Sequence, residues 1–126
     1  MKPRRTVGRA AFSRFELAIA HATGARAELT LRVAHEPETY VIALYGALDA
    51  SNAAELDREL RRAERTDADQ IVLDLSGLHS IDSAAIDLVT GTNARLDGRL
   101  RLLRGAEPVH RKFQRTSLAA ALHFIG

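Results

Sequence analysis

The hydrophobic positions in the first half of the chain alternate with polar ones before they become continuous. Leu29, Leu31 and Val33 are apolar at every second position, which predicts a strand with one face in water. The run TYVIALYG at residues 39–46 is almost entirely apolar and predicts a strand covered on both faces, ended by its glycine. Pro37 lies between the two runs and cannot join a ladder, so the strands are expected to form a hairpin.

Beyond residue 50 the apolar period becomes that of a helix. Residues 51–65 predict an amphipathic helix, which Asn52 can cap with Glu55 three positions later, a variant of the capping box. The stripe expected to face the core consists of Ala53, Leu56, Leu60 and Ala63. A second helix is predicted over residues 84–96, and a third opens at Pro108, a residue type favoured at helix starts.

Short apolar runs between these helices predict further strands. Residues 71–75, IVLDL, indicate a second buried strand, and a turn is expected at 76–83. Residues 99–103, flanked by arginines, predict a short strand near a sheet edge, and residues 117–125 predict one or two more helical turns. Alternating helices and strands imply parallel neighbours joined by right-handed crossovers. We therefore expect one α/β domain over residues 29–126, a small mixed β-sheet with helices packed on it, in the order β-β-α-β-α-β-α.

The segment before this domain fits two interpretations. Phe15, Leu17 and Ile19 alternate as they would in a strand. A helical face can also be drawn, with Gly24 as a stop after it, and it would hold Phe12, Phe15, Ile19 and Ala22. The helical interpretation is favoured at this point. A secretory signal is not expected, because polar and charged residues interrupt the apolar stretch.

Charge is distributed unevenly along the 126 residues. Residues 1–28 hold six Lys or Arg against two Glu, whereas residues 29–126 hold twelve Lys or Arg against fourteen Asp or Glu. The overall pI near 9.5 therefore reflects a basic N-terminal extension, which we expect to be partly disordered or to form one helix or strand. The domain itself is slightly acidic, so direct binding of nucleic acid is not expected.

Several kinds of chemistry find no support in the sequence. The chain has no Cys, which excludes disulfides, thiolate metal sites and thiol catalysis. No two of the five His are three or four positions apart, so no metal site is expected. Neither a phosphate-binding loop nor a dinucleotide fingerprint is present, so no cofactor is expected. No apolar run approaches the ~18 residues of a membrane span, and membrane insertion is not expected.

Asp82 and Ser83 lie side by side where the second helix is expected to begin. Both residue types are preferred helix caps, so Ser83 can be a plain cap. It can equally be a site of modification, because the unpaired N–H groups of a helix start favour an anion. Ser83, His79 and Asp82 could also be imagined as a catalytic triad. The nucleophile-elbow motif G-x-S-x-G is missing, however, and the protein is not expected to be an enzyme.

Asp49 ends the second predicted strand and also has two possible roles. It can bond the amides of the turn that follows. It can also take part in a binding site, because the sites of α/β sheets gather at the carboxyl ends of strands. The sequence leaves both roles open.

Three stretches in this order resemble the STAS domain, a family named for sulfate transporters and anti-sigma-factor antagonists. They are residues 40–60, 71–89 and 98–103. The residues that carry the resemblance are Gly46, Leu48 and Asp49, then Asp74, Leu75 and Ser76, then Ile81, Asp82 and Ser83. The chain departs from the common pattern at Ala47, where the family often has Glu, and at Ala84 and Ala85, where it often has Ser and Gly.

The resemblance implies a function in bacterial transcription control. In regulators of this family a partner anti-sigma factor, a serine kinase of GHKL type, phosphorylates the serine that corresponds to Ser83. The unphosphorylated protein would bind this kinase in the cytoplasm and so free a sigma factor. The residues expected to bind the partner are Asp49, Asp82, Ser83 and the exposed side of the helix after it, with Ile86, Asp87 and Thr90.

An alternative within the same family is a STAS subunit that never meets a kinase. Such a subunit would dock permanently on the ATPase of an ABC transporter for lipids, and Ser83 would serve only as a helix cap. Self-association through residues 1–28 is left open by the sequence.

Overall fold

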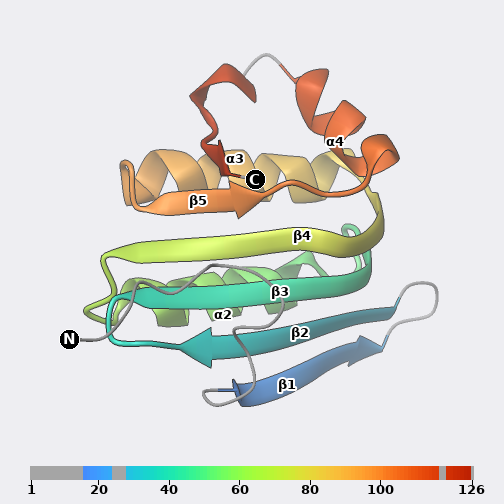
Figure 1. Cartoon of the computed structure of the whole chain (residues 1–126). Coiled ribbons are helices and arrows are strands. Elements are labelled where there is room, and N and C mark those ends of the chain that lie inside the picture. Colours follow the sequence, from blue (N-terminus) through green and yellow to red (C-terminus); the bar gives the residue numbers. More distant parts are fainter. Residues whose placement is uncertain (1–15, 24–27, 117–118, 126) are drawn as a thin grey trace.

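The computed structural model describes residues 16–23, 28–116 and 119–125, and its strands form a single sheet (Figure 1). The strands, in their order across this six-stranded sheet, are β1 (Glu16–Thr23), β2 (Glu28–His35), β3 (Thr39–Leu48), β4 (Gln70–Ile81), β5 (Leu100–Leu103) and β6 (Phe124–Ile125). β1, β2 and β3 pair antiparallel, and β3 to β6 pair parallel. The helices are α2 (Ala53–Glu64), α3 (Ser83–Leu96), α4 (Glu107–Gln114) and the 3-10 turn η2 (Ala119–Ala121).

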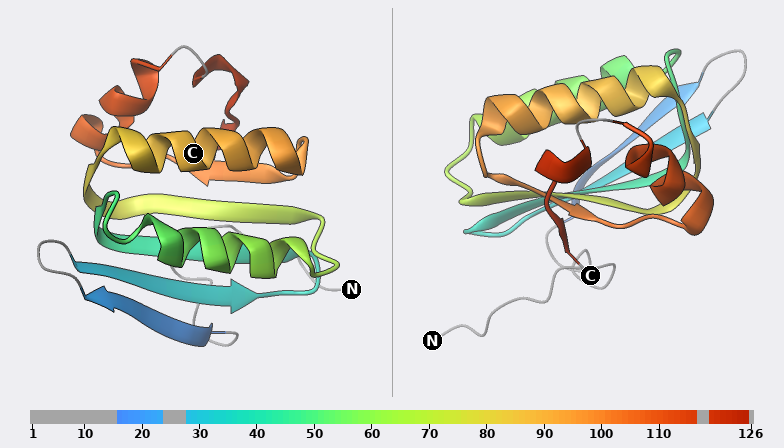
Figure 2. Two further views of the ribbon diagram at one scale, coloured as in Figure 1. Left: turned by 180° about the vertical axis from the view of Figure 1, so that it is seen from behind. Right: turned by 90° about the horizontal axis from the view of Figure 1, so that it is seen from above.

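The predicted α/β architecture is confirmed from β2 onward. β2, β3, α2, β4, α3, β5 and α4 follow one another in the expected order, and β2 and β3 form the expected hairpin around Pro37. Helices α2 and α3 cover the same face of the sheet (Figure 2). The topology explains this placement, because the crossovers from β3 to β4 and from β4 to β5 step in one direction. Two right-handed crossovers of that kind put their helices on one side.

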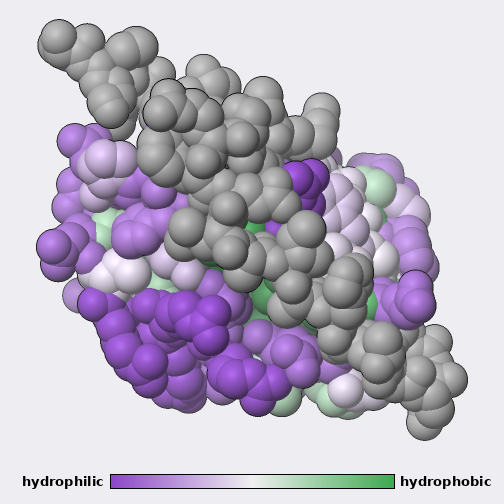
Figure 3. Space-filling view, turned by 90° about the horizontal axis from the view of Figure 1, so that it is seen from below, coloured by the Kyte–Doolittle hydropathy of each residue, from purple (hydrophilic) through white to green (hydrophobic). Residues whose placement is uncertain are grey.

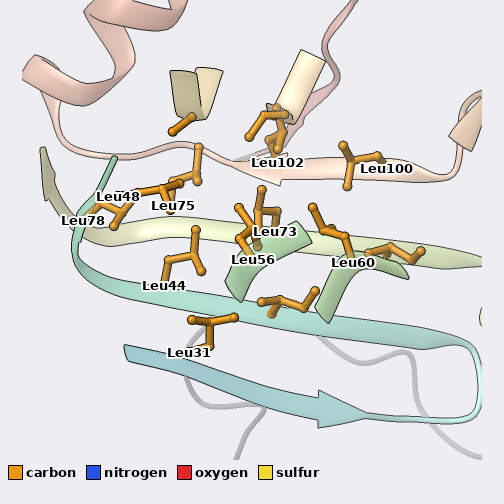
Figure 4. Packing of buried hydrophobic residues seen from close by; sticks show 14 of the residues in the cluster. Leu31, Leu44, Leu48, Leu56, Leu60, Leu73, Leu75, Leu78, Leu100 and Leu102 are labelled. Carbon is orange, nitrogen blue, oxygen red and sulfur yellow. The ribbon is translucent and has the colours of Figure 1, made fainter. Parts of the chain in front are cut away.

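The main core lies between this face of the sheet and the helices. Neighbouring strands and α2 contribute to one buried cluster, which includes Leu31, Leu44, Leu73, Leu102, Leu56 and Leu60 (Figure 4). Burial of each such side chain stabilises the fold by about 1.5–3 kcal/mol, so the cluster fixes α2 on the sheet. Residues 40–44 of β3 are all buried, which confirms the strand covered on both faces. Seen from below, the described surface is mostly hydrophilic, with hydrophobic colour in small areas (Figure 3).

Residues 16–23 form a strand, so the helical interpretation favoured for this segment is wrong. β1 runs antiparallel to β2, and Thr23 lies opposite Glu28. The local apolar period fits both structures, and pairing along the edge of β2 decides between them because it satisfies the backbone N–H and C=O groups. Residues 1–15, most of the predicted basic extension, lie outside the described residues.

β3 and β4 both continue beyond their predicted ends. β3 passes Gly46, which has φ +106 next to a shift in the ladder register. A Cβ on Gly46 would lie 2.3 Å from the carbonyl oxygen of Glu28, so the close approach of β2 also requires glycine here. β4 extends to Ile81, so the turn predicted at residues 76–83 is wrong for most of its length. The exposed polar residues of this stretch resemble a turn in the sequence, although their backbone pairs with β3.

The C-terminal region combines confirmed and corrected predictions. Pro108 lies in the first turn of α4, as expected. One or two helical turns were expected over residues 117–125. The described part of this segment forms only the 3-10 turn η2 and then the short strand β6. Residues 117–118 lie outside the described residues. β6 pairs with β5, which places β5 one strand from the edge and confirms the prediction for residues 99–103.

Candidate functional site

The ends of β3 and β4 bring the two predicted site regions together. Leu48 and Ile81 lie opposite each other at the carboxyl ends of these parallel strands. Residues 49–52, which follow β3, therefore lie beside residues 82–83, which follow β4. We call these two segments together the strand-end site. In open α/β sheets this edge is where binding sites collect.

Asp82 ties the two segments of the strand-end site together. Its Oδ1 accepts a hydrogen bond from the backbone N–H of Ala85 at 2.9 Å and so caps α3. Its Oδ2 accepts a hydrogen bond from the backbone N–H of Ala50 at 3.1 Å. The backbone N–H of Asp82 donates to the carbonyl oxygen of Leu48 at 3.2 Å. One carboxylate therefore fixes the turn after β3 to the start of α3.

Ser83 is the first residue of α3, and it is exposed. The interpretation of Ser83 as the helix cap is wrong. Asp82 occupies the N-cap position, with φ −113 and ψ 177, and supplies the capping oxygen. Among the described residues, no side chain or backbone group forms a hydrogen bond with the Ser83 hydroxyl. The hydroxyl can therefore react or bind without breaking a contact of the described fold.

Residues 49–52 form a turn that side chains hold together. Asp49 Oδ1 accepts hydrogen bonds from the backbone N–H and the hydroxyl of Ser51, at 2.8 and 2.6 Å, which confirms that Asp49 bonds a turn amide. Asn52 Oδ1 accepts from the backbone N–H of Asp49 at 2.9 Å, and its amide donates to the carbonyl oxygen of Ala47 at 2.9 Å. The capping box predicted with Glu55 is wrong, because the Asn52 side chain makes no capping bond to α2 and holds the turn instead.

The side of α3 that was predicted to be exposed is largely closed to solvent. Asp87 is exposed, whereas only 7% of the Ile86 surface and 8% of the Thr90 surface are exposed. Ile86 and Thr90 are four positions apart and share one side of the helix, at the border of its apolar stripe, which explains their burial. The surface of α3 next to Ser83 is therefore formed by Ala84 and Asp87.

Lys112 is a residue of this region that sequence reasoning missed. It lies on α4, and its Nζ donates a hydrogen bond to the carbonyl oxygen of Ile81 at 3.0 Å. Both views of the fold place α4 beside the N-terminal end of α3 (Figures 1 and 2). The only signal in the sequence is rarity, because the chain has one other lysine, Lys2. No local pattern connects two residues that are 31 positions apart.

The chemistry available at the strand-end site is that of the exposed Ser83 hydroxyl on a hydrogen-bonded frame, since the other exposed hydroxyl, that of Ser51, donates to Asp49. The part of the chain that the structure describes contains no group of three metal-ligating side chains. Both carboxylate oxygens of Asp82 accept backbone amides, so the described contacts do not join Asp82 to His79 and Ser83 as a triad. No helix among the described residues is long and apolar enough to cross a membrane.

The chain belongs to the STAS domain family. The family model matches residues 30–125, which covers most of β2, the strands from β3 to β6 and all the helices described above. The resemblance seen in the sequence is therefore confirmed. A comparison with curated proteins gives no match.

Solved structures share this fold at low sequence identity. An anti-sigma factor antagonist from Mycobacterium paratuberculosis is 17% identical, with a TM-score of 0.70 over 76% of this chain and 84% of that chain. The anti-sigma factor antagonist SpoIIAA in its unphosphorylated form is 24% identical, with a TM-score of 0.62 over 76% and 88%. The Bacillus cell fate determinant SpoIIAA in its phosphorylated form is 24% identical, with a TM-score of 0.59 over 76% and 91%. These similarities establish the fold.

Proposed function

We propose that this protein is a phosphorylation-switched binding module that acts as an anti-sigma factor antagonist in the cytoplasm and catalyses no reaction itself. Unphosphorylated, it binds an anti-sigma factor, a serine kinase of GHKL type, and so releases a sigma factor. Phosphorylated on Ser83, it dissociates. The proposal is supported by the fold shared with anti-sigma factor antagonists, of which SpoIIAA is found in both phosphorylation states.

The observation that carries the proposal is the separation of roles between Asp82 and Ser83. Asp82 caps α3 and binds the turn after β3, while the adjacent Ser83 is exposed at the first helical position. A phosphate on Ser83 would lie at the positive end of the helix dipole, where an anion is stabilised. Phosphorylation can therefore change the surface while the fold stays intact.

Charge explains how such a modification would release a partner. A phosphate adds about −1.5 to −2 charges at neutral pH. It would lie next to the carboxylate of Asp82 and on the same helix as the exposed Asp87. A partner packed on this surface would have to desolvate that charge or place a negative charge of its own against it. Either effect costs several kcal/mol, which is roughly a hundredfold or more in affinity.

The test first isolates a GHKL-type kinase by co-purification with the native protein, and then measures its binding to Ser83 variants by calorimetry. Ser83→Ala should bind this kinase as the wild type does, and should stay bound when ATP is added. Ser83→Asp carries part of the charge of a phosphate and should weaken binding tenfold or more, about 1.4 kcal/mol. Ser80→Asp is the matched control, because Ser80 is exposed nearby on β4 and should tolerate the charge.

Two results would contradict the switch. Equal affinities of wild type, Ser83→Ala and Ser83→Asp would leave a constitutive docking module, such as the subunit of a lipid-transporting ABC complex. A phosphate that mass spectrometry places on Ser76 or Ser80 would contradict the assignment of the modified residue.

A further inference from the structure

The peptide unit between Ile81 and Asp82 faces two different elements. Its N–H donates to the carbonyl oxygen of Leu48, on the side of β3. The carbonyl oxygen of the same unit points the opposite way in a trans peptide. On that side β5 pairs with β4 only as far as Asp74, so no described strand reaches this carbonyl group. The hydrogen bond that a neighbouring strand would donate comes instead from Lys112 of α4, whose Nζ lies 3.0 Å from the Ile81 carbonyl oxygen.

This contact brings a cation to within two residues of Ser83. Lys112 is exposed, and its charge is offered to a neutral carbonyl group rather than to a carboxylate. The nearest carboxylate along the chain, Asp82, already accepts two backbone amides. The acidic residue of the first turn of α4, Glu107, is paired with Arg104 at 4.0 Å. In the described contacts the ammonium of Lys112 therefore has no anionic partner.

We propose that Lys112 is the internal counter-charge of phosphorylated Ser83, and that it exchanges the carbonyl group of Ile81 for the phosphate when Ser83 is modified. This inference rests on the proposed function, because it requires phosphorylation of Ser83. A hydrogen bond between ammonium and phosphate is stronger than one between ammonium and a neutral carbonyl group. The flexible four-carbon stem of lysine lets the ammonium change position by rotation about its side-chain bonds.

The exchange would give α4 a part in the switch. In the unphosphorylated state Lys112 joins α4 to the end of β4. In the phosphorylated state it would join α4 to the start of α3 and neutralise part of the new charge. The phosphate would then be held on the surface of its own domain, with one side turned toward α4.

Phosphorus NMR titration of the phosphoprotein tests this inference. Phosphoserine is placed at residue 83 during synthesis, so that no kinase is needed, in the wild type, Lys112→Gln, Lys112→Arg and Arg111→Gln. Glutamine removes the charge, keeps an N–H donor and shortens the side chain by one atom, whereas arginine keeps the charge. Arg111→Gln is the matched control, because Arg111 is an exposed cation next to Lys112 on α4.

The titration should give a lower second pKa of the phosphate in the wild type than in Lys112→Gln, by about half a unit at low salt, the size expected for an exposed charge pair. Lys112→Arg and Arg111→Gln should behave as the wild type does. Equal pKa values in wild type and Lys112→Gln would overturn the inference, as would an equal effect of Arg111→Gln. The proposed function is overturned by a different result, namely that a co-purified GHKL-type kinase does not phosphorylate Ser83.

Discussion

At the scale of single residues, Asp82 and Ser83 are neighbours with different energetic roles. The Asp82 carboxylate holds the first turn of α3 and the turn after β3, whereas the Ser83 hydroxyl forms no hydrogen bond with a described residue. Asp82→Ala should therefore lower the free energy of unfolding by about 0.5–2 kcal/mol for the cap alone, and by more if the Ala50 amide stays unpaired. Ser83→Ala should change it by less than about 0.5 kcal/mol, as is usual at surface positions. Urea denaturation of both variants measures the difference, and equal losses would contradict the assignment of the cap.

The sequence indicated that Asp82 and Ser83 lie at a helix start, but it did not show which of the two caps the helix. The residue types indicated a helix start, and helix ends read from sequence are uncertain by one or two positions. A shift of one position is enough to move the cap from Ser83 to Asp82. Lys112 could not be predicted at all, because its contact with Ile81 depends on how α4 packs against the end of β4.

At the scale of elements, a buried polar pair joins β3 to α2. Tyr40 is 2% exposed and donates its hydroxyl hydrogen to Glu59 Oε2 at 2.5 Å, and Glu59 also accepts from Arg62 at 3.0 Å. Burial and the hydrogen bond to the Glu59 carboxylate raise the pKa of Tyr40 above its ordinary value of 10.0. The neutral phenol is thus the form that the folded state prefers.

The raised pKa of Tyr40 predicts alkaline destabilisation with a defined sign. Above pH 10 the unfolded chain loses the phenolic proton while the folded chain keeps it, so the stabilisation is complete below pH 10 and falls as the pH rises further. Tyr40→Phe should reduce this slope by removing the Tyr40 contribution, and it should also lower stability at neutral pH because Glu59 loses a donor. Tyr45→Phe leaves the pair intact and should keep the slope. Chemical denaturation between about pH 9 and pH 11 gives the answer, and an unchanged slope in Tyr40→Phe would contradict it.

The elements that sequence predicted best are those with a strong period and one buried face. Leu56, Leu60 and Ala63 of α2 are fully buried, as their spacing indicated. The wrong predictions concern segments whose structure is decided by pairing with a neighbouring strand. The segment 16–23 fits two periods, and the end of β4 is rich in polar residues. In both places backbone hydrogen bonds to a neighbouring strand, which no local pattern encodes, determine the outcome.

At the scale of the whole molecule, one core connects the sheet with its helices. The main buried cluster contains residues from every element between β2 and α4, for example Leu29, Leu60, Val89, Leu100 and Phe113. Unfolding should therefore be cooperative, with a calorimetric enthalpy equal to the van't Hoff enthalpy. Two separate transitions in differential scanning calorimetry would show that part of the domain unfolds independently.

The order of the strands bears on how the chain can fold while it is being synthesised. Along the sheet the strands lie in the same order as in the sequence, from β1 to β6. Each new strand that emerges can be added at the growing edge, next to the strand made just before it. No strand has to be inserted between two that are already paired, and no earlier segment has to wait for a distant one. This arrangement permits assembly in the direction of synthesis, N-terminal elements first.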